Sequence, residues 1–390
     1  MALPYIGYFY NFMGGFMTDT NDAFAPIEKS GAVHKFEFTG TWQELLPLAL
    51  KNFFLNVITL SLYRFWGRTR VRRYLWSRTS IMGDPFEYAG NGKELFFGFV
   101  IVLLIVFVPF FGMLYWGQMM LLTDPMTGGI IMAASYIGLL FLFGVGWYRA
   151  QKFRLSRTRW RGIRGGLEDN GVKYGLKFLG YTILNVFTLG FAAPYSANKL
   201  WSAESNTRRF GTAKFSYNGF ASQFYGRFFG AIGIMILMMI AIVVLMSFLA
   251  IGTALSMDSL GSGQTPEITA AAILSMIFVY LAYVFSATFA YTFYQFGKMR
   301  VFWNHTKLEN AEFHFTGTLG GMLKMIIGNF FIEILTLGIL HPIAQMRWLR
   351  YFSTNLEIYG NLDLEAIAQR EGEVMTYGEG LAEGFDFGGV

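Results

Sequence analysis

An apolar seven-residue segment occurs three times in this chain, and it constrains the fold more than any other feature. Its copies are residues 55–61, 184–190 and 332–338, and each ends in Thr-Leu-Gly or Thr-Leu-Ser. The first and third copies also match without a gap over a longer run. A repeat in so apolar a chain predicts an architecture assembled from similar packed elements.

The composition is that of a membrane protein. Hydrophobic residues make up 54% of the chain and charged residues only 14%, whereas soluble domains have about 25% charged residues. Four segments lack any charged residue and reach the roughly 20 apolar residues that a bilayer crossing requires. We therefore predict four transmembrane helices in two hairpins, at residues 95–117, 129–148, 228–252 and 269–297.

The repeats divide the chain into a membrane domain and two flanking segments. We predict an N-terminal lead at 1–34, a membrane domain at 35–364 and an acidic, glycine-rich tail at 365–390. The predicted fold class is an all-α polytopic membrane protein, with the four full transmembrane helices, three repeated kinked or re-entrant helical elements, and short cytoplasmic β-strands. The three repeats span about residues 35–90, 156–219 and 313–364.

Each repeat combines a strand-like piece with a broken helix. Residues 35–38 alternate like a strand, and Thr41 with Glu44 predicts a capped helix from Trp42 to about Ile58. Glycine and proline at the later breaks predict that the helix is interrupted there. The first copy has Ser61 and Phe65 at these positions, so its break has less support.

The placement of basic residues distinguishes two topologies. If every repeated element crossed the bilayer once, there would be seven crossings, and several basic clusters would lie outside the cell. If each element enters and leaves on the cytoplasmic face, every basic cluster lies inside, and the loops at 118–128 and 253–268, which lack Lys and Arg, lie outside. We favour the re-entrant topology.

Polar residues inside the repeated apolar elements are the first candidates for a functional site, because such groups are costly to insert into a membrane. Glu333 stands where the other copies have asparagine, so it is a candidate to bind a cation, take a proton or pair with Lys51. The other interpretation is that these groups join neighbouring helices or reach the interface. The candidates are Lys51, Asn52, Asn56, Thr59, Asn185, Thr188, Asn329, Glu333 and Thr336.

The arginines have aromatic neighbours and are expected to contact anionic lipid head groups on the cytoplasmic face. A nucleic-acid partner is not expected, because no recognised motif accompanies them. The residues predicted to contact head groups are Arg68, Arg70, Arg73, Arg157, Arg159, Arg161, Arg164, Arg347 and Arg350.

Motifs for metal, cofactor or catalytic chemistry are not found in the sequence. The chain has no cysteine, and its four histidines lack the paired spacing of a metal site. Its glycines form no phosphate-binding motif. We therefore expect no metal, no cofactor and no enzymatic activity.

Several segments resemble one known family. They are the entry at 36–41, the Thr-Leu-Gly and Thr-Leu-Ser triplets, the Arg-Thr-Arg-Trp-Arg-Gly-Ile-Arg stretch at 157–164, and the Phe-x-Tyr-x-Gly closures at 86–90 and 215–219. In these residues the chain resembles the YjgN family of bacterial inner-membrane proteins, whose domain has no known function. The resemblance implies a location in the bacterial inner membrane and a multi-span fold, and it implies no activity, substrate or site residue.

Two functional hypotheses follow from the sequence. The first is that the repeat-built bundle transports a small solute, an ion or a lipid, because transporters place their sites at broken apolar helices with polar centres. The second is a membrane scaffold or regulatory protein, whose basic cytoplasmic platform binds anionic lipid or a protein partner that the sequence does not identify.

Overall fold

The computed structural model describes residues 32–258, 270–360 and 367. The predicted N-terminal lead and acidic tail therefore lie almost entirely outside the described residues. The described chain divides into two compact bodies. The first body contains the described residues of 222–301, and the second body contains the described parts of 26–221 and 302–390.

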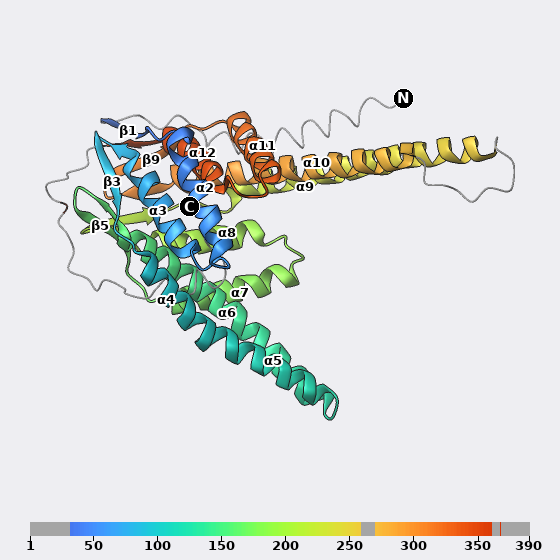
Figure 1. The fold of residues 1–390 in the computed structure, drawn as a ribbon, viewed down its shortest axis with the longest axis horizontal. Helices are drawn as coiled ribbons and strands as arrows, with labels where there is room; N and C mark the ends of the chain where they lie inside the picture. The colour runs from blue at the N-terminus through green and yellow to red at the C-terminus, as the bar shows by residue number, and fades with distance from the viewer. Residues whose placement is uncertain (1–31, 259–269, 361–366, 368–390) are drawn as a thin grey trace. The chain divides into compact units, whose positions relative to one another are not determined.

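The second body is organised around a closed antiparallel β-barrel of ten strands (Figure 1). The predicted all-α fold class is therefore wrong. Its strands are only three to six residues long, and each has at least one partner far away in sequence. Period-two patterns therefore indicate single strands and not their closure into a barrel. The strands are β1 Val33–Phe38, β2 Thr79–Ile81, β3 Asp84–Tyr88, β4 Thr158–Trp160, β5 Ile163–Leu167, β6 Arg208–Phe210, β7 Ala213–Tyr217, β8 Thr306–Leu308, β9 Ala311–Phe315 and β10 Leu356–Tyr359.

The strands follow one another around the barrel in sequence order, and β1 pairs with β10 to close it, with Lys35 opposite Glu357. Two-residue turns join β2 to β3, β4 to β5, β6 to β7 and β8 to β9 at one rim. In the first turn Met82 and Gly83 both have positive φ, as the favoured hairpin turns require. Every connection at the opposite rim is helical.

Five helical insertions leave this opposite rim. Two are long hairpins, and three are short pairs that correspond to the sequence repeats. The helices are α2 Trp42–Ile58, α3 Arg64–Ser77, α4 Gly92–Val102, the π-helix η1 Leu103–Phe107, α5 Val108–Leu121, α6 Pro125–Arg157, α7 Val172–Phe187, α8 Ala193–Ser205, α9 Ser222–Asp258, α10 Ala270–Asn304, α11 Leu319–Leu335 and α12 His341–Thr354.

The four predicted transmembrane segments lie on helices that are long and apolar enough to cross a membrane. These candidate spans are Gly92–Leu121, Pro125–Arg157, Ser222–Phe248 and Ile273–Asn304. The two in the second body continue directly from barrel strands, since α4 follows β3 and α6 runs into β4. The prediction of four membrane helices in two hairpins is confirmed in length and composition.

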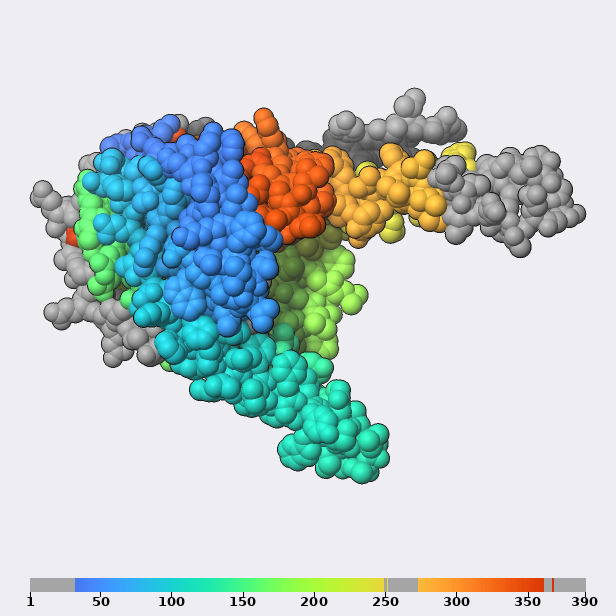
Figure 2. All heavy atoms as spheres, viewed as in Figure 1, coloured from blue at the N-terminus to red at the C-terminus, as the bar shows by residue number. Residues whose placement is uncertain are grey.

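The first short helix pair, α2 and α3, packs against α12 of the last pair. Leu45 of α2 and Val71 and Leu75 of α3 form one buried cluster with Ile343 and Met346 of α12. The blue and orange segments accordingly lie side by side in Figure 2. These helices therefore bring the N-terminal and C-terminal parts of the second body's chain into contact, as the pairing of β1 with β10 does in the barrel.

A recurring aromatic–glycine contact fixes the passage from strand to helix. The ring of Phe38 folds back over Gly40, so that a Cβ there would lie 2.7 Å from a ring carbon. Tyr88 covers Gly90 in the same way, as Phe315 covers Gly317, and a Cβ would lie 2.5 Å from each ring. The glycine of the Phe-x-Tyr-x-Gly closure is thus required for space, and the motif marks the exit of a strand from the barrel.

The three Thr-Leu-Gly or Thr-Leu-Ser triplets form chain reversals of one geometry. Leu60, Leu189 and Leu337 each have φ near 50°. The threonine connects the two helices of each pair: Thr59 Oγ1 donates to Leu55 O at 2.6 Å and accepts from Tyr63 N at 3.0 Å. Each repeated element therefore consists of two helices, and the chain reverses its direction at the triplet between them.

The proline of the later copies has a different role from the predicted one. Pro194 and Pro342 lie in the first turn of α8 and α12, where a missing N–H costs nothing. They begin the second helix and do not break the first. The first copy forms the same reversal without them, with Ser61 at φ 68° where the others have glycine.

This geometry predicts that Ser61→Gly stabilises the protein. A left-handed conformation costs a residue with a Cβ about 1–2 kcal/mol, and the extra freedom of glycine in the unfolded chain offsets part of this gain. We expect the free energy of unfolding to rise by about 0.5–1 kcal/mol, measured as thermal or denaturant unfolding of the purified protein. Ser61→Ala, which keeps the Cβ, is the control and should show no gain, and a destabilised Ser61→Gly variant would refute the argument.

Candidate functional site

The polar residues predicted as a membrane site lie in three separate helix pairs and do not converge on one site. Asn52 Nδ2 of α2 donates to Gly67 O of α3 at 3.3 Å. Asn329 Nδ2 of α11 donates to Ala344 O of α12 at 3.1 Å, which is the equivalent bond in the third pair. These contacts favour the interpretation that the asparagines join the two helices of each pair.

In the second pair a different hydrogen bond joins the two helices, because Asn185 Oδ1 of α7 accepts from Ser196 Oγ of α8 at 3.1 Å. Thr188 repeats the role of Thr59, because its Oγ1 donates to Leu184 O at 2.8 Å and accepts from Ala192 N at 3.1 Å. Thr336 makes the corresponding bonds in the third pair. Asn56 lies at the end of α2, with its side-chain oxygen buried and without a hydrogen-bond donor.

Glu333 is bound within its own helix pair. Its Oε1 lies 2.6 Å from His341 Nδ1, and His341 Nε2 lies 3.0 Å from the side-chain nitrogen of Gln345. Lys51 is exposed on α2, so the salt bridge with Glu333 that the sequence suggested is replaced by a local pair. A role of these residues in a transport pathway stays a prediction.

Four of the nine arginines predicted to contact lipid head groups bind protein groups. Arg73 donates to Gly90 O at 2.7 Å, and Arg350 donates to Gly40 O, so both hold the strand-to-helix junctions. Arg157 pairs with Glu94 at 2.8 Å and Arg161 with Asp84 at 2.5 Å. The arginines therefore stabilise the barrel rim as well as carrying charge.

The remaining arginines have varied surroundings. Arg70 lies over the ring of Tyr63. Arg159 and Arg164 face each other across β4 and β5. Arg68 and Arg347 are half-buried on α3 and α12. Contact of any of these with lipid stays a prediction.

The tips of the three short helix pairs are strongly apolar and exposed. The central leucine of each triplet stands out from the body, with Leu60 88%, Leu189 87% and Leu337 90% exposed. Ile58 and Phe187, next to these triplets, are 76% and 83% exposed. In water such tips would be unfavourable, because full burial of a large aliphatic side chain is worth about 1.5–3 kcal/mol.

The outer wall of the barrel is charged, in contrast to these tips. Ion pairs connect neighbouring strands, with Lys35 Nζ 2.9 Å from Glu357 Oε1 and Lys307 Nζ 2.5 Å from Glu312 Oε1. Arg209 makes two bonds to Glu168, at 2.9 and 2.7 Å. A wall of this kind is suited to water.

Two buried phenols support the barrel as hydrogen-bonding groups. Burial raises the pKa of Tyr217, whose hydroxyl donates to Asn198 Oδ1 at 2.6 Å. Burial, followed by its hydrogen bond to Glu357, raises the pKa of Tyr359 to about 12. Both phenols are therefore neutral at physiological pH and act as donors.

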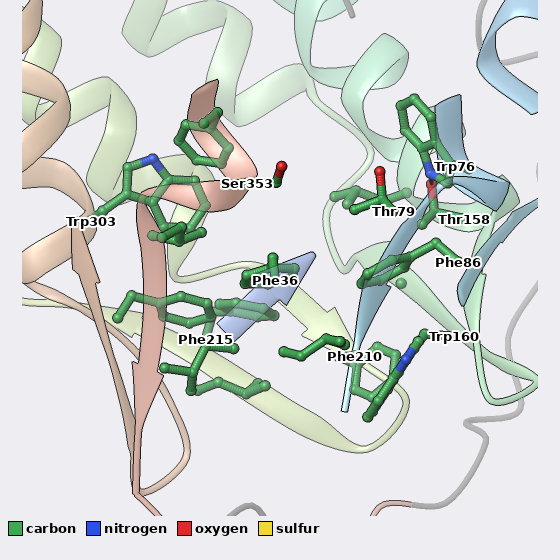
Figure 3. A pocket seen from close by; sticks show the side chains of 18 of the residues that line it. Phe36, Trp76, Thr79, Phe86, Thr158, Trp160, Phe210, Phe215, Trp303 and Ser353 are labelled. Carbon is green, nitrogen blue, oxygen red and sulfur yellow. Dashed lines mark hydrogen bonds between the residues drawn. The ribbon is translucent and has the colours of Figure 1, made fainter. Parts of the chain in front are cut away.

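The barrel interior holds a cavity of about 320 Å³ that sequence reasoning missed (Figure 3). Aromatic side chains from six strands line it, and neighbouring rings are in contact, for example Phe86 with Trp160 at 6.3 Å between centroids and Trp160 with Phe210 at 5.8 Å. The strand residues that supply the rings are Phe36, Phe86, Trp160, Phe210, Phe215 and Phe313.

A sequence signal for this cavity existed in the closures. The first aromatic residue of each Phe-x-Tyr-x-Gly closure, such as Phe86 or Phe215, lines the cavity, while the second covers the glycine. The spacing could not show that these phenylalanines meet, because the closures lie more than a hundred residues apart and only the barrel brings them together.

The four apolar helices and the charged barrel with apolar tips define an integral membrane protein. The chain belongs to the family of bacterial proteins of unknown function DUF898, whose profile matches residues 33–384. It is similar to proteins named inner membrane protein YjgN. The relative from Salmonella typhimurium is 24% identical over 369 residues, covering 85% of this chain and 89% of the relative.

Shorter matches give the same printed name. The relative from Escherichia coli O157:H7 is 26% identical over 133 residues, covering 34% of this chain and 30% of the relative. The relative from E. coli K12 is 26% identical over 115 residues, covering 29% and 27%. No solved structure matches this chain significantly. The relatives' names together with the apolar helices place the protein in the inner membrane.

The asparagine contacts predict a loss of stability without their amides. Asn52→Ala and Asn329→Ala should each lower the free energy of unfolding by about 0.5–1.5 kcal/mol, because each removes a hydrogen bond between the two helices of its pair. Asn56→Ala is the matched control on the same helix, and its effect should be smaller, since its side-chain oxygen accepts no hydrogen bond. Equal losses at all three positions in denaturant unfolding would contradict this interpretation.

Proposed function

We propose that this protein is a lipid-handling membrane protein whose barrel lies at the cytoplasmic surface of the inner membrane. The two long hairpins span the bilayer, and the three short helix pairs dip into it from the same side. The observation that carries the proposal is the exposure of Leu60, Leu189 and Leu337 at three equivalent tips. In the proposal, the internal repeat supplies three similar contacts with the lipid.

Helix length supports insertion without crossing. The first helices of the pairs, α2, α7 and α11, have 17, 16 and 17 residues, or about 25 Å at 1.5 Å per residue. This is less than the roughly 30 Å of the hydrocarbon core. Both ends of each pair join neighbouring strands at one barrel rim, so a pair that enters the bilayer returns to the face from which it came.

Charge placement supports the cytoplasmic side for the barrel. The strands and the helix ends beside them carry most of the arginines and lysines. The segment 118–128, at the far end of the first long hairpin, has no Lys or Arg, and neither has the sequence 253–268 between the two spans of the second. Basic residues remain on the cytoplasmic side of inner-membrane proteins.

Lipid is the class of ligand that these surfaces favour over a small solute or an ion. Seven of the nine polar candidates in the helix pairs are engaged within their own pairs, as Asn52 and Glu333 illustrate, whereas the tips and the barrel cavity are apolar. We further propose that the protein acts by binding and not by catalysis, without a metal, a cofactor or nucleic acid.

The scaffold hypothesis has less support from the barrel wall. Three of its basic residues, Arg161, Arg209 and Lys307, are neutralised by acidic neighbours. A basic platform for a protein partner would therefore depend on the other positive charges.

The proposal predicts that the three tips reside in lipid. Because the natural chain has no cysteine, Leu60→Cys, Leu189→Cys and Leu337→Cys can each carry one environment-sensitive fluorophore in liposomes. Emission should shift to the blue, and spin-labelled acyl chains should quench it. Glu87→Cys, exposed on β3 of the barrel wall, is the control and should report water.

Emission from the tips equal to that from position 87 would refute membrane insertion. As a second measurement, the wild-type protein extracted with native lipid would be analysed by mass spectrometry for bound molecules. Retention of particular lipids supports the proposal, whereas retention of a polar solute alone would return the solute-transport hypothesis to first place.

Orientation gives a separate prediction. Lys214→Cys lies on the barrel wall at β7, and Thr123→Cys lies at the tip of the first long hairpin. A membrane-impermeant thiol reagent added to spheroplasts should label position 123 and leave position 214 unlabelled until the membrane is opened. Labelling of position 214 in intact spheroplasts would place the barrel on the other side of the membrane.

A further inference from the structure

The cavity inside the barrel has the size of a ligand site. Its volume of about 320 Å³ is roughly twice that of an engineered 150 Å³ cavity that binds benzene, and it lies at the lower end of the range for natural small-molecule pockets. It has room for one hydrocarbon chain or ring system and not for a whole two-chain lipid.

The three side-chain hydroxyls that line the cavity already donate hydrogen bonds to the protein. Thr79 Oγ1 donates to Leu75 O and Thr158 Oγ1 to Arg154 O, each at 2.9 Å. Ser353 Oγ donates to Arg350 O at 3.2 Å. Each of these residues lies at the end of a helix, and its hydroxyl donates to a carbonyl of that helix. The hydroxyl protons are therefore not available to a ligand.

Two of the three indole N–H groups among the lining residues, those of Trp76 and Trp160, are engaged as well. Trp76 Nε1 donates to Thr158 Oγ1 at 2.9 Å and Trp160 Nε1 to Asp84 O at 3.1 Å. Arg209 is the one charged residue among those that line the cavity, and its guanidinium is bonded to Glu168 of the barrel wall. A polar ligand would therefore lose its water here and find few new partners, at a cost of several kcal/mol.

We propose that the barrel interior binds a single hydrocarbon chain of a lipid. Ring faces from the strands surround an aliphatic chain with dispersion contacts that need no directional bond. The helices supply the remaining wall, through Trp76 of α3 and Leu349 and Phe352 of α12. These two helices belong to the pairs that carry the exposed tips Leu60 and Leu337.

The chain itself already places one aliphatic group in this site. Ile367, beyond β10, is 9% exposed and lines the same cavity. A branched alkyl group from outside the barrel is therefore compatible with the aromatic interior, which supports an alkyl occupant over a flat aromatic one.

This inference deepens the proposed function, but the two fail separately. Water-exposed tips would refute membrane insertion and leave a cavity that takes a free fatty acid. An empty cavity would leave the inserted tips and their lipid contacts intact.

The test is photo-crosslinking of the full chain in lipid nanodiscs. One sample receives palmitic acid with a diazirine on the chain, and another contains phosphatidylcholine with the same chain. After irradiation, mass spectrometry should find saturable adducts on barrel residues such as Phe86, Trp160 and Phe210, and unlabelled palmitate or phosphatidylcholine should compete. The probe that labels identifies the source of the chain as free acid or intact lipid.

A filling substitution provides the matched comparison. Leu308→Phe adds a ring inside the cavity, whereas Ser216→Phe on the paired strand adds the same ring to the exposed wall. We expect the first to lower barrel labelling about tenfold, corresponding to about 1.4 kcal/mol of lost binding, and the second to leave it unchanged. If Leu308→Phe does not fold, Ile81→Phe serves as the filling variant.

Two results would overturn the proposal. One is that both probes give adducts only on membrane helices such as α5 and α9, which is labelling by surrounding lipid. The other is that a folded filling variant is labelled in the barrel as strongly as the wild type.

Discussion

The closure of the barrel by hydrogen bonds between β1 and β10 is the constraint on which the second body depends. An open sheet of strands only three to six residues long would leave unpaired N–H and C=O groups along two edges. Pairing Val33 with Tyr359 and Lys35 with Glu357 removes the last edges. It also fixes the five helical insertions at one rim, so that the apolar parts leave the barrel from one end.

Apolar side chains of the second body gather in two separate places, the exposed tips of the short helix pairs and the interior of the barrel. The helix tips expose leucines where a bilayer can cover them, and the strands direct phenylalanines and tryptophans into the barrel. Between these lies a charged wall whose ion pairs, such as Arg161 with Asp84, suit an aqueous surface. One repeated sequence serves both, because its closure supplies the interior ring and its triplet supplies the exposed tip. The proposed lipid function follows from this division.

Local structure was predictable wherever it depended on neighbours in sequence. The cap at Thr41 and the helix from Trp42 to Ile58 follow the sequence closely, because capping and helix formation act within one or two turns. The four long apolar helices were equally clear. The break after Thr59 has little support from glycine or proline in the sequence, because there the threonine hydroxyl connects the two helices without them. The polar candidates lie on the helices of the short pairs, and their partners lie across the reversal, a pairing of side chains that the predicted break does not specify.

The sequence alone determined that this is a membrane protein with charge-free helices, because hydropathy and charge are properties of single residues and their immediate neighbours. It also determined that three segments share one local design. Only the tertiary structure decided that ten short strands close into a barrel and that six distant aromatic residues surround one cavity. The closure and the cavity depend on pairings between residues as far apart in sequence as Val33 and Tyr359. A local sequence pattern does not specify which two strands pair.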